Sequence, residues 1–116
     1  MTFLYTGMSS VAIVNLEILY VPDCPNRERA RHRVDKALAV VGMVATIRET
    51  PIPTVEAAAG SGMRGSPTVL IDGIDAFPGD GAEASLSCRL YRSNASVDGA
   101  PSVDQLVEAL AARGRS

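Results

Sequence analysis

The sequence predicts an α/β fold, because stretches with strand-like and helix-like apolar patterns alternate along its 116 residues. A continuous apolar run leads into a stretch with helical spacing, and a second strand-like stretch follows that helix directly. The chain then ends in an amphipathic stretch that opens with a helix-capping motif. This length suits one domain, which we place at residues 11–116, and we expect residues 1–10 to be a poorly ordered extension.

The first expected strand covers residues 13–21. Asn15 and Glu17 interrupt its first half, whereas residues 18–21 are continuously apolar. A continuous apolar run of this kind is typical of a strand that is buried on both faces. Pro22 ends the strand.

A helix is expected at residues 25–41, where Pro25 suits the first turn and Gly42 suits the C-terminal stop. Asp23 is placed to cap this helix with its carboxylate. Arginines and acidic residues are mixed along the helix, so we expect a solvated surface and not a ligand site. The buried stripe should consist of Ala30, Val34, Ala37, Leu38 and Val41.

The next elements complete a strand–helix–strand unit and add a hairpin. Residues 44–50 alternate between apolar and polar side chains, which predicts a second strand. Thr54 is a candidate cap for a short helix that ends in the glycine-rich cluster at residues 60–62. Residues 68–71 form a β-rich run, and the Asp72-Gly73 pair after them indicates a hairpin turn.

The last third of the chain begins with a long, turn-rich loop at residues 73–87, which is either functional or mobile. A strand is expected at residues 88–91. Ser102 then opens a Ser-Val-Asp-Gln pattern that matches a capping box and predicts a final helix. Its apolar stripe consists of Val103, Leu106, Val107 and Leu110.

The composition is that of a globular protein, with 47% hydrophobic residues, 21% charged residues and a net charge of −2. Because phosphate binding requires clustered positive charge, we expect no nucleic-acid partner. No apolar run is long enough for a bilayer and the N-terminus does not resemble a secretory signal, so we expect no membrane contact and a cytoplasmic location. The sequence has no phosphate loop or dinucleotide motif, and no cofactor is expected.

Cys24 is the residue best suited to chemistry. It lies where the first strand passes into the first helix, beside unpaired N–H groups and the positive end of the helix dipole, which favour a thiolate. A thiolate attacks disulfides and binds soft metals. The alternative is a small buried hydrophobe, although a Pro-Asp-Cys-Pro turn should be accessible. We interpret His32 as a surface residue and Tyr20 as a packing residue.

The order of these elements resembles the thioredoxin superfamily. The resemblance rests on Cys24-Pro25 at a strand–helix junction and on Gly65-Ser66-Pro67-Thr68-Val69-Leu70-Ile71 at the following strand. It implies a βαβ-α-ββ-α three-layer sandwich with a mixed central sheet, and a cis peptide bond at Pro67 across from Cys24. It also implies that Ser66 presents its backbone to an extended substrate or a bound thiol. On this basis the substrate-binding residues are Pro25, Arg27, Ser66, Pro67 and Thr68.

The chain departs from the two-cysteine members of this superfamily at Arg27, which stands where they have a second cysteine. A disulfide within this short motif is therefore impossible. By resemblance to one-cysteine members, Arg27 would supply a cation that stabilises the thiolate or meets an anionic ligand.

Cys88 is the second thiol of the chain. If the loop before it folds beside the start of the first helix, Cys88 resolves a mixed disulfide on Cys24 or completes a two-thiolate site for a soft metal. If it does not, Cys88 packs within a strand, and the sequence leaves both alternatives open. Two cysteines fall short of a four-ligand zinc site.

Three functions remain open. The first is a thiol–disulfide oxidoreductase with Cys24 and Cys88 as catalytic residues, acting on a disulfide-containing protein or a low-molecular-weight thiol. The second is binding of mercuric ion by the same two cysteines, from a weaker resemblance of Cys-Pro-Asn and Ser-Cys-Arg-Leu-Tyr to bacterial proteins labelled alkylmercury lyase-like. True lyases have an aspartate where this chain has Arg27. The third is a non-catalytic binding module on a thioredoxin fold.

Overall fold

The protein has a mixed α/β fold, seen in a computed structural model that describes residues 13–78, 85–92 and 97–114, with the backbone alone at 85–88. The expected α/β class is therefore confirmed. The extension at residues 1–10 and the middle of the long loop lie outside the described residues. In chain order the elements are β1 (Ile13–Tyr20), α2 (Arg27–Val41), β2 (Val44–Pro51), α3 (Val55–Ser61), β3 (Arg64–Ser66), β4 (Thr68–Ile71), β5 (Ile74–Asp75), β6 (Ser85–Cys88), β7 (Tyr91–Arg92), β8 (Val97–Asp98) and α4 (Val103–Gly114).

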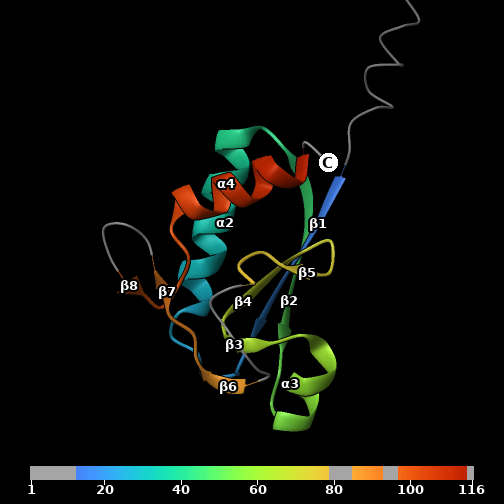
Figure 1. The fold of residues 1–116 in the computed structure, drawn as a ribbon, viewed down its shortest axis with the longest axis vertical. Coiled ribbons are helices and arrows are strands. Elements are labelled where there is room, and N and C mark those ends of the chain that lie inside the picture. Colours follow the sequence, from blue (N-terminus) through green and yellow to red (C-terminus); the bar gives the residue numbers. More distant parts are fainter. Residues whose placement is uncertain (1–12, 79–84, 93–96, 115–116) are drawn as a thin grey trace, which may run out of the picture.

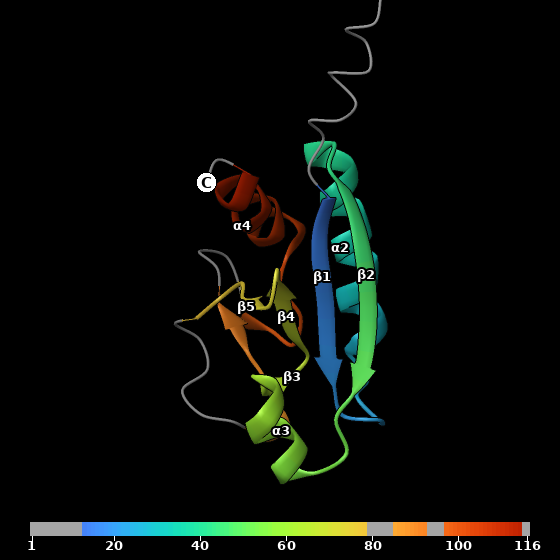
Figure 2. The same cartoon turned by 90° about the vertical axis from the view of Figure 1, so that its right-hand side faces the viewer.

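The central sheet has four strands in the order β2-β1-β4-β5. β1 and β2 are parallel and lie along α2 (Figure 2), whereas β4 is antiparallel to both of its neighbours. Two further pairs stand outside this sheet, a parallel pair of β3 with β6 and an antiparallel pair of β7 with β8. β3, β6 and α3 lie at the opposite end of the molecule from the C-terminal part of α4 (Figure 1).

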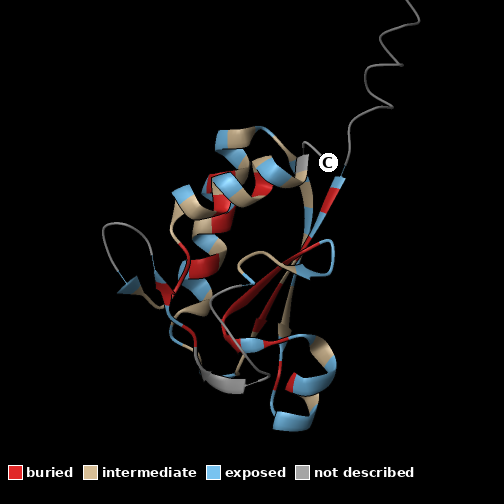
Figure 3. Ribbon diagram, in the orientation of Figure 1, coloured by how far each residue is buried: buried red, intermediate tan, exposed pale blue. Residues whose placement is uncertain are grey.

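Apolar side chains cover both faces of the central sheet, because neighbouring residues of a strand point to opposite faces. Ile18 belongs to a cluster with residues of α2 and α4, and Leu19 belongs to a second cluster with residues of α3. The buried positions follow β4 and the inner sides of α2 and α4 (Figure 3). The sheet therefore has helices on both faces. The first cluster consists of Val14, Leu16, Ile18, Val34, Ala37, Val69, Ile71, Leu106 and Leu110, and the second of Leu19, Ile52, Ala58, Met63 and Leu70.

Two of the three helix caps expected from the sequence, those at Thr54 and Ser102, make the expected bonds. The Ala57 N–H donates to Thr54 Oγ1 at 3.1 Å, at the start of α3. At the start of α4, Ser102 Oγ accepts from the Gln105 N–H at 3.0 Å and the Ser102 N–H donates to Gln105 Oε1 at 2.8 Å. Ser102 and Gln105 thus form the predicted capping box.

Two left-handed turns also match the sequence. Gly42 ends α2 at φ 72°, and its N–H donates to the Leu38 carbonyl at 2.8 Å. Asp72 and Gly73 have φ values of 52° and 84° and join β4 to β5, as a two-residue hairpin turn requires.

The predicted start of the first helix is wrong. α2 begins at Arg27, with Asn26 as its N-cap, so Pro25 lies outside its first turn. The reason is a separate tight turn, in which the Cys24 N–H donates to the Val21 carbonyl at 2.9 Å before the helix opens. The sequence predicts that Asp23 caps this helix, but Asp23 is exposed and lies three residues before the N-cap Asn26. No side chain of the described residues makes a cap hydrogen bond at the start of α2.

The predicted strand at residues 88–91 is also wrong. β6 ends at Cys88 and β7 begins at Tyr91. Arg89 lies between the two strands and belongs to neither, because its side chain is buried in its own set of contacts. The short strand β3 was not predicted from the sequence. Among the described residues, no helix is both long and apolar enough to cross a membrane.

Candidate functional site

Cys24 is a free, half-buried thiol in the turn between β1 and α2. Its neighbours Asp23 and Pro25 are exposed, so the turn reaches the surface on both sides of the cysteine. Cys24 precedes the N-cap Asn26 by two residues. The thiol therefore belongs to the turn before the helix and not to the helix itself.

The Ser66–Pro67 peptide bond is cis, as the resemblance implied. Ser66 Oγ accepts from the Val21 N–H at 3.0 Å, and the Val21 carbonyl accepts from the Cys24 N–H at 2.9 Å. Val21 thus joins the two segments, since its N–H bonds to Ser66 and its carbonyl bonds to Cys24. The cis-proline segment lies directly beside the Cys24 turn.

Ser66, Pro67 and Thr68 are fully buried, and their polar groups are used within the chain. The Ser66 carbonyl accepts from the Arg89 N–H at 3.0 Å, and the Pro67 carbonyl accepts from the Tyr91 hydroxyl. The Thr68 hydroxyl bonds to neighbouring backbone. These residues form a wall next to Cys24, and the two carbonyls of Ser66 and Pro67 accept hydrogen bonds from within the chain. No local signal in the sequence indicates that Arg89 and Tyr91 occupy these acceptors.

The backbone of Cys88 lies opposite Ser66 in the β3–β6 pair. Ser66 therefore contacts both cysteine-bearing segments, the Cys24 turn through Val21 and the end of β6 directly. The sequence leaves open whether Cys88 lies beside the start of the first helix or packs within a strand, and the structure places its backbone at the end of β6, opposite Ser66.

Arg27, which the resemblance offers as a cation for the thiolate or for an anionic ligand, is bound to a carboxylate of β2. Its Nη1 donates to Glu49 Oε1 at 2.8 Å, and its guanidinium lies 4.8 Å from the centre of the Tyr20 ring. The hydrogen bond raises the pKa of Arg27 and lowers that of Glu49 relative to their ordinary values. Arg31 donates to the other oxygen of Glu49 at 2.8 Å. Glu49 therefore holds both arginines through its two oxygens.

A second pair of arginines holds another carboxylate on the other side of the helix start. Arg29 and Arg33 donate to Asp98 at 2.6 and 3.0 Å, and Arg29 also donates to the Asn26 amide oxygen at 2.8 Å. These hydrogen bonds, with Arg29 the largest contributor, lower the pKa of Asp98 to about 2. The sequence predicts a solvated helix surface. In the structure, arginines one helical turn apart on this surface share one carboxylate from another part of the chain. His32 is exposed, as predicted.

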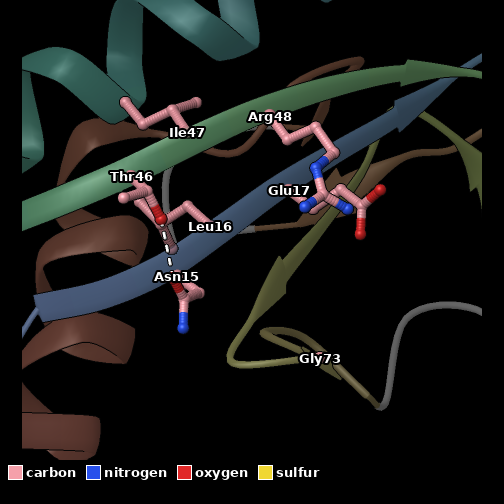
Figure 4. Close-up of a pocket in the computed structure, with 7 residues that line it drawn as sticks. All are labelled: Asn15, Leu16, Glu17, Thr46, Ile47, Arg48 and Gly73. Atoms are coloured by element: carbon pink, nitrogen blue, oxygen red, sulfur yellow. Dashed lines mark hydrogen bonds between the residues drawn. The ribbon is translucent and has the colours of Figure 1, made fainter.

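A separate hollow of about 300 Å³ is lined by residues of β1 and β2 and by Gly73 of the β4–β5 turn (Figure 4). It is polar: Asn15 accepts from the Thr46 hydroxyl at 2.7 Å, and Glu17 and Arg48 face each other across β1 and β2. None of its lining residues is a nucleophile or belongs to the Cys24 turn. We therefore take the Cys24 turn as the candidate site. The lining residues are Asn15, Leu16, Glu17, Thr46, Ile47, Arg48 and Gly73.

Within the described part of the chain, no three His, Cys, Asp or Glu side chains gather as a metal site. Comparison with protein-family models, with curated proteins and with solved structures gives no match. The functional argument therefore rests on the chemistry of the site.

Proposed function

We propose that the protein has a thioredoxin-like fold. The support is the order of its elements: a strand–helix–strand unit, a short helix, a strand preceded by a cis-proline, a hairpin and a final helix. The mixed sheet with helices on both faces agrees with this arrangement.

The activity we propose is thiol–disulfide exchange, with Cys24 as the attacking thiol. The observation that supports it most is the double use of Val21, which bonds to the Cys24 turn and to the residue before cis-Pro67. A half-buried thiol in an exposed turn is open to a reagent, and the adjacent wall fixes the direction of approach. The exposed side, with Pro25 and Arg27, is where a substrate would make contact.

In the first step the Cys24 thiolate attacks a disulfide RS–SR′, forms a Cys24–SR mixed disulfide and releases R′S⁻, which takes up a proton. In the second step the Cys88 thiolate attacks Cys24 Sγ, forms the Cys24–Cys88 disulfide and releases RS⁻, which is protonated. The substrate gains two electrons and the protein loses two. Two equivalents of a low-molecular-weight thiol then reduce the protein disulfide and leave as a disulfide.

The test is a comparison of Cys24→Ser and Cys88→Ser with the unaltered chain, using a small disulfide and a disulfide-bonded protein as alternative substrates. Cys24→Ser should lose mixed-disulfide formation and turnover with both. Cys88→Ser should retain the mixed disulfide on Cys24, visible by mass spectrometry, and lose the internal bridge. If Cys24→Ser turns over either substrate at the unaltered rate, the proposed function is wrong.

Mercuric ion is a second candidate, favoured by the placement of the Cys88 backbone opposite Ser66. Two thiolates bind this soft ion without a third ligand type. Titration with mercuric ion should then show one site that is lost in both serine variants. Binding that survives in either variant removes this candidate.

A further inference from the structure

The side chain of Arg89 is buried immediately after Cys88, with 1% of its surface exposed. Its Nη1 donates to the two oxygens of Asp75 at 3.0 and 3.2 Å, and its Nη2 donates to the Phe77 carbonyl. The guanidinium also lies 4.9 Å from the centre of the Tyr91 ring. Arg89 thus ties the end of β6 to the β4–β5 hairpin and the residues after it.

Stability alone does not account for this arginine. Among the described residues none accepts a hydrogen bond from Arg89 Nε, which is a buried donor. A buried ion pair often stabilises no better than apolar side chains of similar volume, and an unpaired buried donor adds a cost. The guanidinium does provide a fixed position, since its Nη1 holds Asp75 while its Nη2 holds the Phe77 carbonyl, and a planar group bound through both nitrogens accepts few alternative geometries.

The β3–β6 pair needs such a fixed point. Its register is irregular, because Arg64 pairs with Ser85 while Ser66 pairs with Cys88, so β6 has one more residue than β3 between the two pairs. A pair this short, with Gly65 at the centre of β3, specifies its register weakly, and a slip by one residue turns every side chain to the other face. The Arg89 N–H donates to the Ser66 carbonyl at 3.0 Å, next to the Ser66–Cys88 pair.

We propose that Arg89 is a positioning residue that fixes the register of β6 and thereby keeps Cys88 within reach of Cys24. This inference rests on the proposed function, because it concerns the step in which Cys88 resolves a mixed disulfide on Cys24. The proposed role is exerted through the placement of the Cys88 backbone and not through contact with a substrate.

The experiment measures the equilibrium between the Cys24–Cys88 bridge and a glutathione redox buffer, by mass spectrometry of the full chain after acid quenching. Arg89→Met should lower the equilibrium constant for the bridge at least about tenfold, equal to about 30 mV, because Cys88 then samples several registers. Arg89→Lys retains the charge opposite Asp75 without the planar guanidinium. Its equilibrium constant for the bridge should lie between those of Arg89→Met and the unaltered chain. The rate of alkylation of Cys24 should stay within about twofold in both variants.

The matched control is Arg113→Met. Arg113 also pairs with an aspartate of this hairpin, Asp72 at 3.1 Å, but it is 38% exposed and lies on α4. This variant should bridge like the unaltered chain. If Arg89→Met does not fold, Arg89→Lys and Asp75→Asn decide, and a bridge as stable in both as in the unaltered chain overturns the inference.

Two failures are distinguishable. If the unaltered chain forms a mixed disulfide on Cys24 but no internal bridge, the positioning role is wrong and the proposed exchange at Cys24 stands. If Cys24 forms no mixed disulfide at all, the proposed function itself is wrong.

Discussion

The contact between Gly99 and the Asn26 side chain predicts that Gly99→Ala destabilises the fold. A Cβ atom at Gly99 would lie 2.3 Å from Asn26 Nδ2 and 2.9 Å from its Cγ, closer than non-bonded atoms approach. The φ of Gly99 is not in the left-handed region, so the backbone itself would accept alanine. The cost comes from displacing Asn26, which is the N-cap of α2 and accepts a hydrogen bond from Arg29.

Overpacking of this kind costs about 1–3 kcal/mol. We expect about 1 kcal/mol for Gly99→Ala, at the lower end of that range, because the displaced atoms are the end of a side chain that can rotate. In a domain of this size the change lowers the melting temperature by about 4 °C or more. Urea denaturation followed by circular dichroism measures the free energy of unfolding directly.

Gly60→Ala is the matched control. Gly60 lies within α3, and no atom comes within 4 Å of the position that a methyl group would take there, so alanine should stabilise the helix by about 0.5–1 kcal/mol. A second control places Gly99→Ala in an Asn26→Ala background, where the obstructing amide is gone and the cost should fall to about zero. The reasoning is refuted if Gly99→Ala is neutral, or if its cost persists when Asn26 is alanine.

Two further predictions concern the ends of the helices. The pKa of Asp98 is lowered to about 2, so its ion pairs stabilise the fold fully above the ordinary value of 3.8 and are lost as the pH falls through about 2. Between about pH 4 and pH 2 the unaltered chain should therefore lose more stability than Asp98→Asn, and parallel acid-unfolding curves would contradict this. Ser102→Ala should lower the free energy of unfolding, measured by urea denaturation, by about 1 kcal/mol, because it removes one bond of the capping box at α4. A loss of only about 0.2 kcal/mol or less would contradict this prediction.

Much of the fold is predictable because local chemistry decides it. The Ser102 capping box, the Asp72-Gly73 turn and the Gly42 stop each depend on residues within one turn of the chain. The buried stripe of α2 follows in the same way from helical spacing, and Ala30 is fully buried as predicted.

The parts that sequence reasoning missed depend on contacts between distant residues. Nothing local shows that Arg27 would meet Glu49, twenty-two positions away, or that Asp98 would meet two arginines of α2. The local pattern places Arg89 within a strand, yet its pairing with Asp75 buries it. The resemblance implies the cis-proline. It does not imply that the Ser66 carbonyl accepts from the Arg89 N–H, because that bond joins segments that are far apart in the sequence.

The central claim is that the folded chain makes Cys24 a reactive thiol. The most direct measurement is the rate at which the single thiol of Cys88→Ser reacts with a chromogenic aromatic disulfide, in the folded protein and again in denaturing urea at the same pH. We predict faster reaction in the folded protein, because the Ser66–Pro67 wall orients a disulfide that enters at the open side of the Cys24 turn, whereas the unfolded chain orients nothing. A folded thiol that reacts more slowly than the unfolded one would contradict the proposal.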